Sequence, residues 1–287
     1  MASLRIAVTG GSGLVGRAVV RCLVGRGHQV VNLDCKQSPD RLARFVFADL
    51  RRREQVQPVF EHVDAVCHLG EIPSLMNLTP EYVFTHNTAA GSVVMQTAAD
   101  LGIKRLIYTS SIQYYGIYGD QTAVPLFLPM DESHPPQPQQ AYALSKVANE
   151  QYAQLVSRLS GMSIAIFRLP WTHDWSHLSH PDHDPAWFAK PTPNLFELGA
   201  YLHVDDAAEA YALAVERPRP GCEAYNLVAA EACTNRPVRE VFAERHPNYP
   251  ALPTDWPAFR SPYVADKIRA HFGWEPRWNV RERHRPR

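Results

Sequence analysis

The chain has 287 residues, with 29 Lys and Arg against 29 Asp and Glu, and 45% of its residues are hydrophobic. This length suits one large domain or two small ones, with ample material for a buried core. A net charge of zero, without a dense basic block, argues against a nucleic-acid-binding protein. The sequence has no apolar stretch of about 18 residues, so we expect no membrane span.

The five cysteines, at positions 22, 35, 67, 222 and 233, are odd in number and show no C-x-x-C spacing. Such cysteines are typical of reduced thiols and not of a disulfide or zinc framework, so we expect a cytoplasmic protein. A strand pattern begins at Leu4 and leaves no room for a signal peptide. These features together favour an enzyme or a ligand-binding protein.

The first half of the chain alternates short apolar runs with helical patterns. Strands are predicted at residues 4–9, 29–34, 44–47, 64–69, 105–109 and 163–168, and the clearest helices at 14–26, 80–101 and 142–159. Apolar strands separated by helices indicate a parallel sheet that is covered on both faces. The predicted fold is therefore α/β, a Rossmann-type doubly wound parallel sheet with a small C-terminal substrate-binding subdomain.

Proline marks a change of character along the chain. Fifteen of the 24 prolines lie after residue 150, where the regular alternation also breaks down. We expect residues 1–169 to form the sheet domain, with 201–228 returning to it. Residues 170–200 and 229–287 are expected to form the small subdomain, with Trp256 and Trp274 in its core.

A glycine-rich segment, TGGSGLVG at 9–16, follows the first strand and opens the first helix. It reads as G-x-x-G-x-x-G through Gly10, Gly13 and Gly16, and as G-x-G-x-x-G through Gly11. A tight turn with small residues lets the backbone approach a pyrophosphate, which then faces the N–H groups at the helix start. The alternative is a plain strand–helix turn.

Asp34 ends the second strand, 18 residues past Gly16. An acid about 20 residues past such a loop binds the ribose hydroxyls of a bound dinucleotide. Its charge would repel a 2′-phosphate, which favours NAD over NADP as the cofactor. The nearby Lys36 keeps NADP open as the alternative.

A second pattern combines Tyr142 and Lys146, in YALSK at 142–146, with the hydroxyls that end the fifth strand. Residues four apart on a helix share a face, and a nearby cation lowers the pKa of a tyrosine. Such a tyrosine suits a general base. Alone, the pair would more often lie on a surface helix, but Thr109, Ser110 and Ser111 stand where parallel sheets bind ligands.

The motifs resemble, in order along nearly the whole chain, those of the extended short-chain dehydrogenases/reductases, the NAD-dependent epimerase/dehydratase family. The matching segments are TGGSGLVG at 9–16, Asp49-Leu50, His68-Leu69-Gly70, Asn87, YTSS at 108–111 with Tyr115-Gly116, YALSK at 142–146 and His203-Val204-Asp205-Asp206. The resemblance implies an NAD-binding sheet domain and hydride transfer at a secondary alcohol or carbonyl.

The resemblance also implies residue roles. Tyr142 would be the acid/base, Lys146 would lower its pKa and bind the nicotinamide ribose, and Ser111 would hold the substrate oxygen. The expected NAD-binding residues are Gly10, Gly13, Leu14, Val15, Asp34, Asp49, Leu50, Leu69, Gly70, Asn87, Thr109, Tyr142, Lys146, Leu169 and Pro170.

The substrate prediction depends on a departure from the family pattern. Members that act on nucleotide sugars usually carry an Asn where this chain has Trp171, and the C-terminal part is short for enclosing a nucleotide. Both features favour a free sugar, sugar acid or similar polyhydroxy substrate, as in the uronate-dehydrogenase-like branch. The candidate substrate residues are Glu71, Ser74, Ser111, Gln113 and Trp171.

Three functions stay open on the sequence: a dehydrogenase that releases NADH, a sugar epimerase or dehydratase that retains NAD, and a catalytically inactive dinucleotide-binding regulator. The His- and Asp-rich segment 171–184 could suggest a metal site, but it lacks regular ligand spacing. We interpret it as a polar lid over the substrate and expect no metal.

We also expect a homodimer, joined through the helices at about 80–101 and 141–159, as is common in the resembling family. Both helices are apolar over more than one face. The apolar residues are Val93, Val94, Ala98, Leu101, Ala143, Val147, Ala148, Tyr152, Leu155 and Val156. The alternative is that both faces pack within one subunit.

Overall fold

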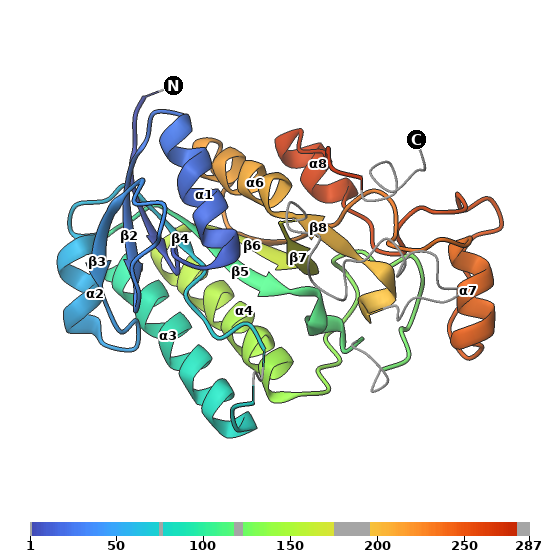
Figure 1. Ribbon diagram of the computed structural model, residues 1–287. Coiled ribbons are helices and arrows are strands. Elements are labelled where there is room, and N and C mark those ends of the chain that lie inside the picture. The colour runs from blue at the N-terminus through green and yellow to red at the C-terminus, as the bar shows by residue number, and fades with distance from the viewer. Residues whose placement is uncertain (1, 75–76, 118–122, 175–195, 280–287) are drawn as a thin grey trace.

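The structure is a computed structural model that describes residues 2–74, 77–117, 123–174 and 196–279. Its centre is a seven-stranded parallel sheet in the order β3-β2-β1-β4-β5-β6-β9, with helices on both faces (Figure 1). The strands are β1 (Arg5–Thr9), β2 (Gln29–Asp34), β3 (Arg44–Phe47), β4 (Ala65–His68), β5 (Arg105–Ser111), β6 (Ser163–Leu169) and β9 (Cys222–Asn226). The predicted Rossmann-type doubly wound parallel sheet is confirmed, since the strand order reverses direction beside β1.

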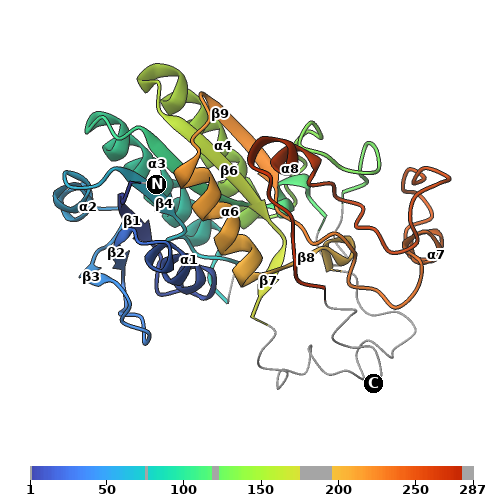
Figure 2. The same cartoon turned by 90° about the horizontal axis from the view of Figure 1, so that it is seen from above.

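The sheet lies between two helical layers, which Figure 2 shows from above. One face carries α1 (Leu14–Gly25) and α6 (Val204–Glu216), and the other carries α2 (Arg53–Phe60), α3 (Pro80–Asp100) and α4 (Ala141–Ser160). The predicted strands at 29–34 and 44–47 and the three predicted long helices agree with the structure to within one residue. No helix in the described ranges is both long and apolar enough to cross a membrane.

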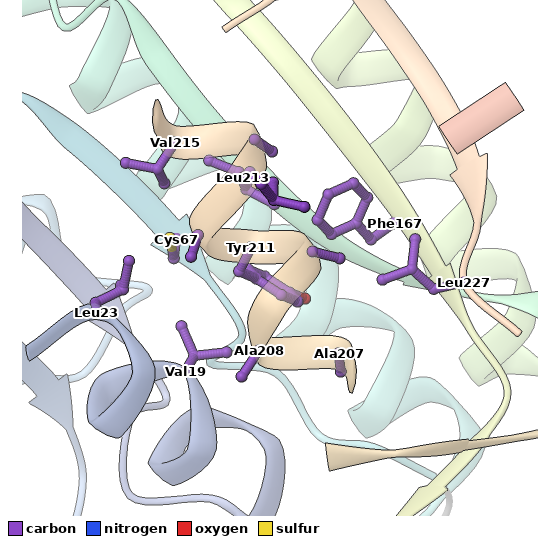
Figure 3. Packing of buried hydrophobic residues seen from close by; sticks show 14 of the residues in the cluster. Val19, Leu23, Cys67, Phe167, Ala207, Ala208, Tyr211, Leu213, Val215 and Leu227 are labelled. Atoms are coloured by element: carbon purple, nitrogen blue, oxygen red, sulfur yellow. The ribbon is translucent and has the colours of Figure 1, made fainter. Parts of the chain in front are cut away.

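The core on the α6 side is built around a helix that is buried along most of its length. Tyr211 of α6 is fully buried and meets the ring of Phe167 of β6 edge to face, with ring centroids 5.0 Å apart (Figure 3). Val19 and Leu23 of α1 belong to the same buried cluster. Since α6 comes from residues 204–216, the chain returns to the sheet after residue 200, where β9 adds the last strand beside β6.

Apart from a 3-10 helix at Ile112–Tyr115, the remaining elements follow β6. Strand β7 (Trp171–His173) pairs in parallel with β8 (Tyr201–His203), while a short 3-10 helix (Phe196–Gly199), α7 (Val238–Arg245) and α8 (Asp266–Phe272) complete the chain. A third buried cluster joins Ile112 and Tyr115 to Val228 and Tyr263. It combines residues from both sides of position 170, and the predicted division of the chain at that point stays a prediction.

The expectation for Trp274 is wrong. Trp274 is 1% exposed and belongs to the cluster under α6, where its indole N–H donates to the carbonyl of Asp206 at 2.9 Å. The indole needs both an apolar environment and an acceptor, and α6 offers both. Trp256, in contrast, packs against the third cluster, where its N–H donates to the carbonyl of Arg260.

The glycine-rich turn between β1 and α1 has almost no space for side chains. Gly10 has a φ of 71°, a conformation that favours glycine. A Cβ placed on Gly16 would collide with the carbonyl oxygen of Gly10, whereas a Cβ on Gly25, at the end of the same helix, would meet nothing within 4 Å. The packing therefore requires glycine at position 16, whereas position 25 has space for a side chain.

This contrast gives a matched pair of variants. We expect Gly16→Ala to lower the free energy of unfolding by about 1–3 kcal/mol through overpacking. Gly25→Ala should leave it unchanged or raise it by up to about 1 kcal/mol, because alanine is the better helix former. Urea unfolding followed by circular dichroism measures both. Equal effects of the two substitutions would contradict the packing described for the turn.

Candidate active site

The carboxyl ends of the central strands meet at one edge of the sheet. Thr9 at the end of β1 lies beside His68 at the end of β4, and His68 lies beside Tyr108 of β5. Ser111, the last residue of β5, lies beside Leu169, the last residue of β6. Open parallel sheets bind their ligands at this edge. The register therefore brings together residues that are far apart in the sequence.

The glycine-rich turn fits a dinucleotide. Helix α1 begins after Gly13, its first turn has no acidic residue, and no side chain caps its N-terminus. Its first N–H groups can therefore face an anion. A Cβ on Gly10 would collide with the backbone of Gly70, so the segment after β4 packs directly on the turn. Leu14 and Val15 open α1, and Leu69 and Gly70 lie against Gly10; their predicted contacts with NAD stay a prediction.

Asp34 lies at the end of β2, next to the glycine-rich turn. It is 8% exposed, and its carboxylate accepts hydrogen bonds from the backbone N–H of Ser12 at 3.0 Å and of Lys36 at 3.2 Å. Lys36 also uses its carbonyl to accept from the hydroxyl of Ser12. The carboxylate is therefore fixed beside the turn, in a position suited to ribose hydroxyls.

Asp49 and Leu50 follow β3. The guanidinium of Arg51 binds the Asp49 carboxylate at 2.7 Å, and this hydrogen bond is the main reason that the pKa of Asp49 is lowered to about 2. A Cβ on Gly70 would collide with Leu50, which shows that Leu50 packs against the segment after β4. This segment thus touches the turn on one side and Leu50 on the other.

Asn87 of α3 fixes the segment after β4. Its side-chain oxygen accepts from the N–H of Ile72 at 2.9 Å, and its amide donates to the carbonyl of Ile72 at 3.0 Å and to Ser145 at 3.4 Å. Its expected place among the NAD-binding residues stays a prediction. The contacts in the structure give it a supporting role, because they hold the backbone that follows Gly70.

Ser111 caps the 3-10 helix Ile112–Tyr115, on which α4, the helix that carries Tyr142, packs. Gln140, just before α4, donates to Gln113 at 2.6 Å and ties the start of α4 to that short helix. The hydroxyl of Ser111 accepts from the N–H of Gln113, so its proton can be donated elsewhere. Ser111 and Tyr142 are 5% and 6% exposed.

Lys146 lies one turn after Tyr142, with its ammonium nitrogen 5.5 Å from the centroid of the Tyr142 ring. It donates to the Glu71 carboxylate at 2.6 Å and to the carbonyl of Thr109 at 2.8 Å. Glu71 was expected on the wall of the substrate pocket. Its side chain is 3% exposed and paired with Lys146, since a buried ammonium needs a counter-charge, and its contact with the substrate stays a prediction.

Both members of this pair carry their charge. Burial favours the neutral form of Lys146, but the attraction of Glu71 outweighs it and raises the pKa of Lys146. Burial likewise favours a neutral Glu71, yet Lys146 and His68 together lower the pKa of Glu71. The ammonium and the carboxylate therefore form an ion pair at neutral pH.

The other predicted residues take varied positions. The hydroxyl of Thr109 donates to the carbonyl of His68 at 2.7 Å, and Ser74 is half-buried after β4. Leu169 and Pro170 are buried at the end of β6. Trp171 is half-buried and pairs with Tyr201 in the two-stranded sheet. Of the His- and Asp-rich segment, 175–184 lie outside the described residues.

Sequence reasoning missed a second buried ion pair. Arg168 of β6 binds Glu150 of α4 at 2.7 Å and donates to the hydroxyl of Tyr115 at 2.8 Å. Ser110 donates to the same carboxylate at 2.6 Å. A charged residue inside an otherwise apolar strand, SIAIFR, was the available signal, since such a residue needs a partner when buried.

In the described part of the chain, no three His, Cys, Asp or Glu side chains are grouped to hold a metal.

Comparisons with known proteins agree with this geometry. A model of the NAD dependent epimerase/dehydratase family matches residues 6–172. A putative UDP-glucose 4-epimerase of Methanocaldococcus jannaschii is 31% identical, and the match covers 57% of this chain and 54% of that protein's length. A probable dTDP-glucose 4,6-dehydratase of Sinorhizobium fredii is 28% identical over 96% of the chain and 89% of its own length.

Solved structures show the same fold. The UDP-glucose 4-epimerase of Thermus thermophilus, in complex with NAD, superimposes with a TM-score of 0.71 at 27% identity, over 98% of this chain and 96% of its own. An NAD-bound short-chain dehydrogenase/reductase superfamily protein of Agrobacterium tumefaciens gives a TM-score of 0.75 at 23% identity, over 98% and 94% of the two chains. NAD is the cofactor of the family to which these findings point. The chain belongs to the NAD-dependent epimerase/dehydratase family of the extended short-chain dehydrogenases/reductases.

Proposed function

We propose that this protein catalyses NAD-dependent oxidation or reduction at a secondary alcohol or carbonyl of a sugar, sugar acid or similar polyhydroxy compound. One observation supports the proposal: Lys146 lies 5.5 Å from the Tyr142 ring and donates to the carbonyl of Thr109, two residues before Ser111 at the end of β5. A hydroxyl, a phenol and an ammonium in this arrangement suit proton transfer at an alcohol oxygen.

The residues at the edge fit NAD, which supplies the hydride acceptor or donor when bound. The N–H groups at the start of α1 would hold the pyrophosphate, and Asp34 would bind the hydroxyls of the adenosine ribose. Leu169 and Pro170, buried at the end of β6, would form an apolar wall beside the nicotinamide. The other predicted NAD contacts rest on the family resemblance.

The protein itself supplies proton transfer and orientation. Tyr142 would take the proton from the substrate hydroxyl during oxidation and return one during reduction. Ser111 would hold the same substrate oxygen with its hydroxyl proton, since its own oxygen already accepts from Gln113. Lys146 would favour the phenolate of Tyr142 by its charge. Because all three side chains are nearly buried, their hydrogen bonds act in a low dielectric.

Trp171 favours a small substrate and a dehydrogenase that releases NADH. It stands where nucleotide-sugar enzymes of the family usually carry an Asn, and it packs with Tyr201, Ala229 and Cys233. An indole offers one N–H donor where the amide of Asn offers two, so it is the poorer ligand for a diphosphate. The second candidate is an epimerase or dehydratase that retains NAD, which the names of the related proteins favour.

Two measurements separate these candidates. The purified protein is first assayed for bound NAD and then for NADH formation across a panel of free sugars, sugar acids and nucleotide sugars. A dehydrogenase should be isolated with little NAD and form free NADH with a small sugar. Firmly bound NAD, with interconversion of sugars and no net NADH, would support the epimerase instead. If the protein carries out neither reaction with any compound of the panel, the proposed function is contradicted.

The role of Tyr142 is tested by removing one oxygen. Tyr142→Phe should lower kcat about 10²–10⁴-fold, the usual contribution of a general acid or base. The affinity for NAD, measured by calorimetry, should stay close to that of the wild type, because the ring remains. A variant that retains half of the wild-type rate would refute the assignment of Tyr142.

Cofactor choice is tested at Asp34. Asp34→Ala removes a ribose hydrogen bond and a charge that repels a 2′-phosphate. The ratio of the dissociation constants for NADP and NAD should therefore fall at least about 10-fold, equivalent to about 1.4 kcal/mol. Dissociation constants for both cofactors measure this change. If the wild-type protein already binds NADP more tightly than NAD, the assignment of Asp34 is wrong.

A homodimer through α3 and α4 remains a proposal. Part of the predicted apolar surface, including Val94, Ala98 and Val156, is buried inside the subunit, where the two helices pack on each other. Leu155 and Leu159, however, are 38% and 76% exposed and can meet a second copy. The cytoplasmic location expected from the cysteines likewise stays a prediction.

The dimer has a matched control. Leu155→Glu should shift the mass in solution from twice the chain mass of 32.3 kDa towards a single chain, because it places a charge in the interface. Leu42→Glu, at a leucine that is 47% exposed and lies near Arg17 of α1, should leave the mass unchanged. Light scattering at micromolar concentration measures both. A wild-type protein that stays monomeric on concentration would contradict the dimer.

A further inference from the structure

A buried polar cluster lies directly behind Lys146, and the proposed chemistry does not use it. Its centre is Glu71, whose carboxylate is reached from three elements. Lys146 and Asn149 of α4 donate to it at 2.6 and 2.9 Å. The hydroxyl of Tyr108 of β5 donates at 3.3 Å, and Nε2 of His68 of β4 lies 3.3 Å from it.

The cluster is built into the packing of the helices. Asn149 donates both to Glu71 and to the carbonyl of Asn87 in α3, and it can do so because Gly91 leaves space for its side chain. The backbone of the segment carrying Glu71 is fixed by Asn87 through Ile72. The carboxylate therefore has a defined position and does not depend on a flexible loop.

We propose that Glu71 is a positioning residue: it fixes Lys146 and balances its charge, so that Tyr142 adjoins a neutral ion pair and not an isolated cation. The inference rests on the proposed role of Tyr142 as the acid/base. It follows from the geometry, because the ammonium that is 5.5 Å from the Tyr142 ring is bound to the carboxylate at 2.6 Å. Glu71 thereby sets the pH at which Tyr142 can accept a proton.

Other ionisable groups also surround the pair. They are His68 of β4, Tyr108 of β5, His86 of α3, and Tyr142 and Glu150 of α4. Glu150 is held by Arg168, and burial lowers the pKa of His86. Burial, together with the charge of Glu71, raises the pKa of Tyr108. Of the two carboxylates near Lys146, Glu71 bonds to it directly, whereas Glu150 is paired with Arg168.

The test is a titration of the Tyr142 phenol, which needs no substrate. Phenolate formation is followed by ultraviolet absorbance, and the signal of Tyr142 is obtained by subtracting the same protein carrying Tyr142→Phe. Glu71→Gln removes the negative charge, so Tyr142 should titrate about one pH unit lower, the effect of a unit charge roughly 10 Å away at an effective dielectric of about 20. Glu71→Asp keeps the charge and should restore most of the wild-type value.

Glu216→Gln is the matched control. Glu216 is also a buried carboxylate, 5% exposed and paired with Arg26, but it lies at the far end of α6. Its removal should cost stability without moving the titration of Tyr142. An unchanged titration in a folded Glu71→Gln protein, or an equal shift in Glu216→Gln, would overturn the proposal.

If Glu71→Gln does not fold, the double variant Glu71→Gln/Lys146→Met takes its place, since it leaves no buried charge unpaired. Because the ammonium lies nearer to Tyr142 than the carboxylate does, removing both charges should raise the titration of Tyr142 by no more than about one pH unit. A rise of about two pH units or more, the effect of a lone charge at this distance, would show that Lys146 acts as an isolated cation, and this would overturn the proposal. Because these titrations use no substrate, they separate the role of Glu71 from the identity of the sugar.

Discussion

The ammonium of Lys146 must be held, charged, inside the protein, and much of the site can be understood from this constraint. Its side chain is 4% exposed, so water cannot stabilise it. The fold provides the carboxylate of Glu71 and the carbonyl of Thr109 as partners. To deliver that carboxylate, the segment after β4 must turn back under α4, and Asn87 of α3 fixes it there.

The parallel sheet makes this arrangement possible. Strands β1, β4, β5 and β6 end at the same edge, and each delivers a different part of the site to it. The turn after β1 presents N–H groups, β4 leads to Glu71, β5 ends in Ser111, and β6 ends in Leu169. Since α4 begins near this edge with Tyr142 and Lys146, the proposed cofactor and proton-transfer sites would share one scaffold.

The fold, and the residues that we propose for catalysis, could be recognised from local patterns. Apolar strands, the glycine-rich turn and the pair Tyr142 and Lys146 each have a signature within a few consecutive residues. Short elements late in the chain had no such signature. Strands β7 and β8 have three residues each, and α8 has seven, too few to show a periodicity. Their positions depend on tertiary contacts.

The role of Glu71 could not be predicted, because it depends on contacts between distant residues. Its partners Tyr108, Lys146 and Asn149 lie 37, 75 and 78 positions away in the chain. By position alone, a carboxylate just after a strand end was assigned to the substrate pocket. The position of Trp274 also depends on a contact between distant residues, because its indole donates to the carbonyl of Asp206, 68 positions away in the chain.

The central claim is that Tyr142 and its neighbours support redox chemistry on a polyhydroxy substrate with NAD. A single-turnover experiment tests it most directly: the NAD-loaded protein is mixed rapidly with each compound of the sugar panel, and the absorbance of reduced nicotinamide is followed. Both a dehydrogenase and an epimerase must form reduced nicotinamide, lasting or transient. The account predicts this signal for at least one compound in the wild-type protein and its loss in Tyr142→Phe. Absence of the signal with every compound, or its survival in Tyr142→Phe at the wild-type rate, would contradict the account.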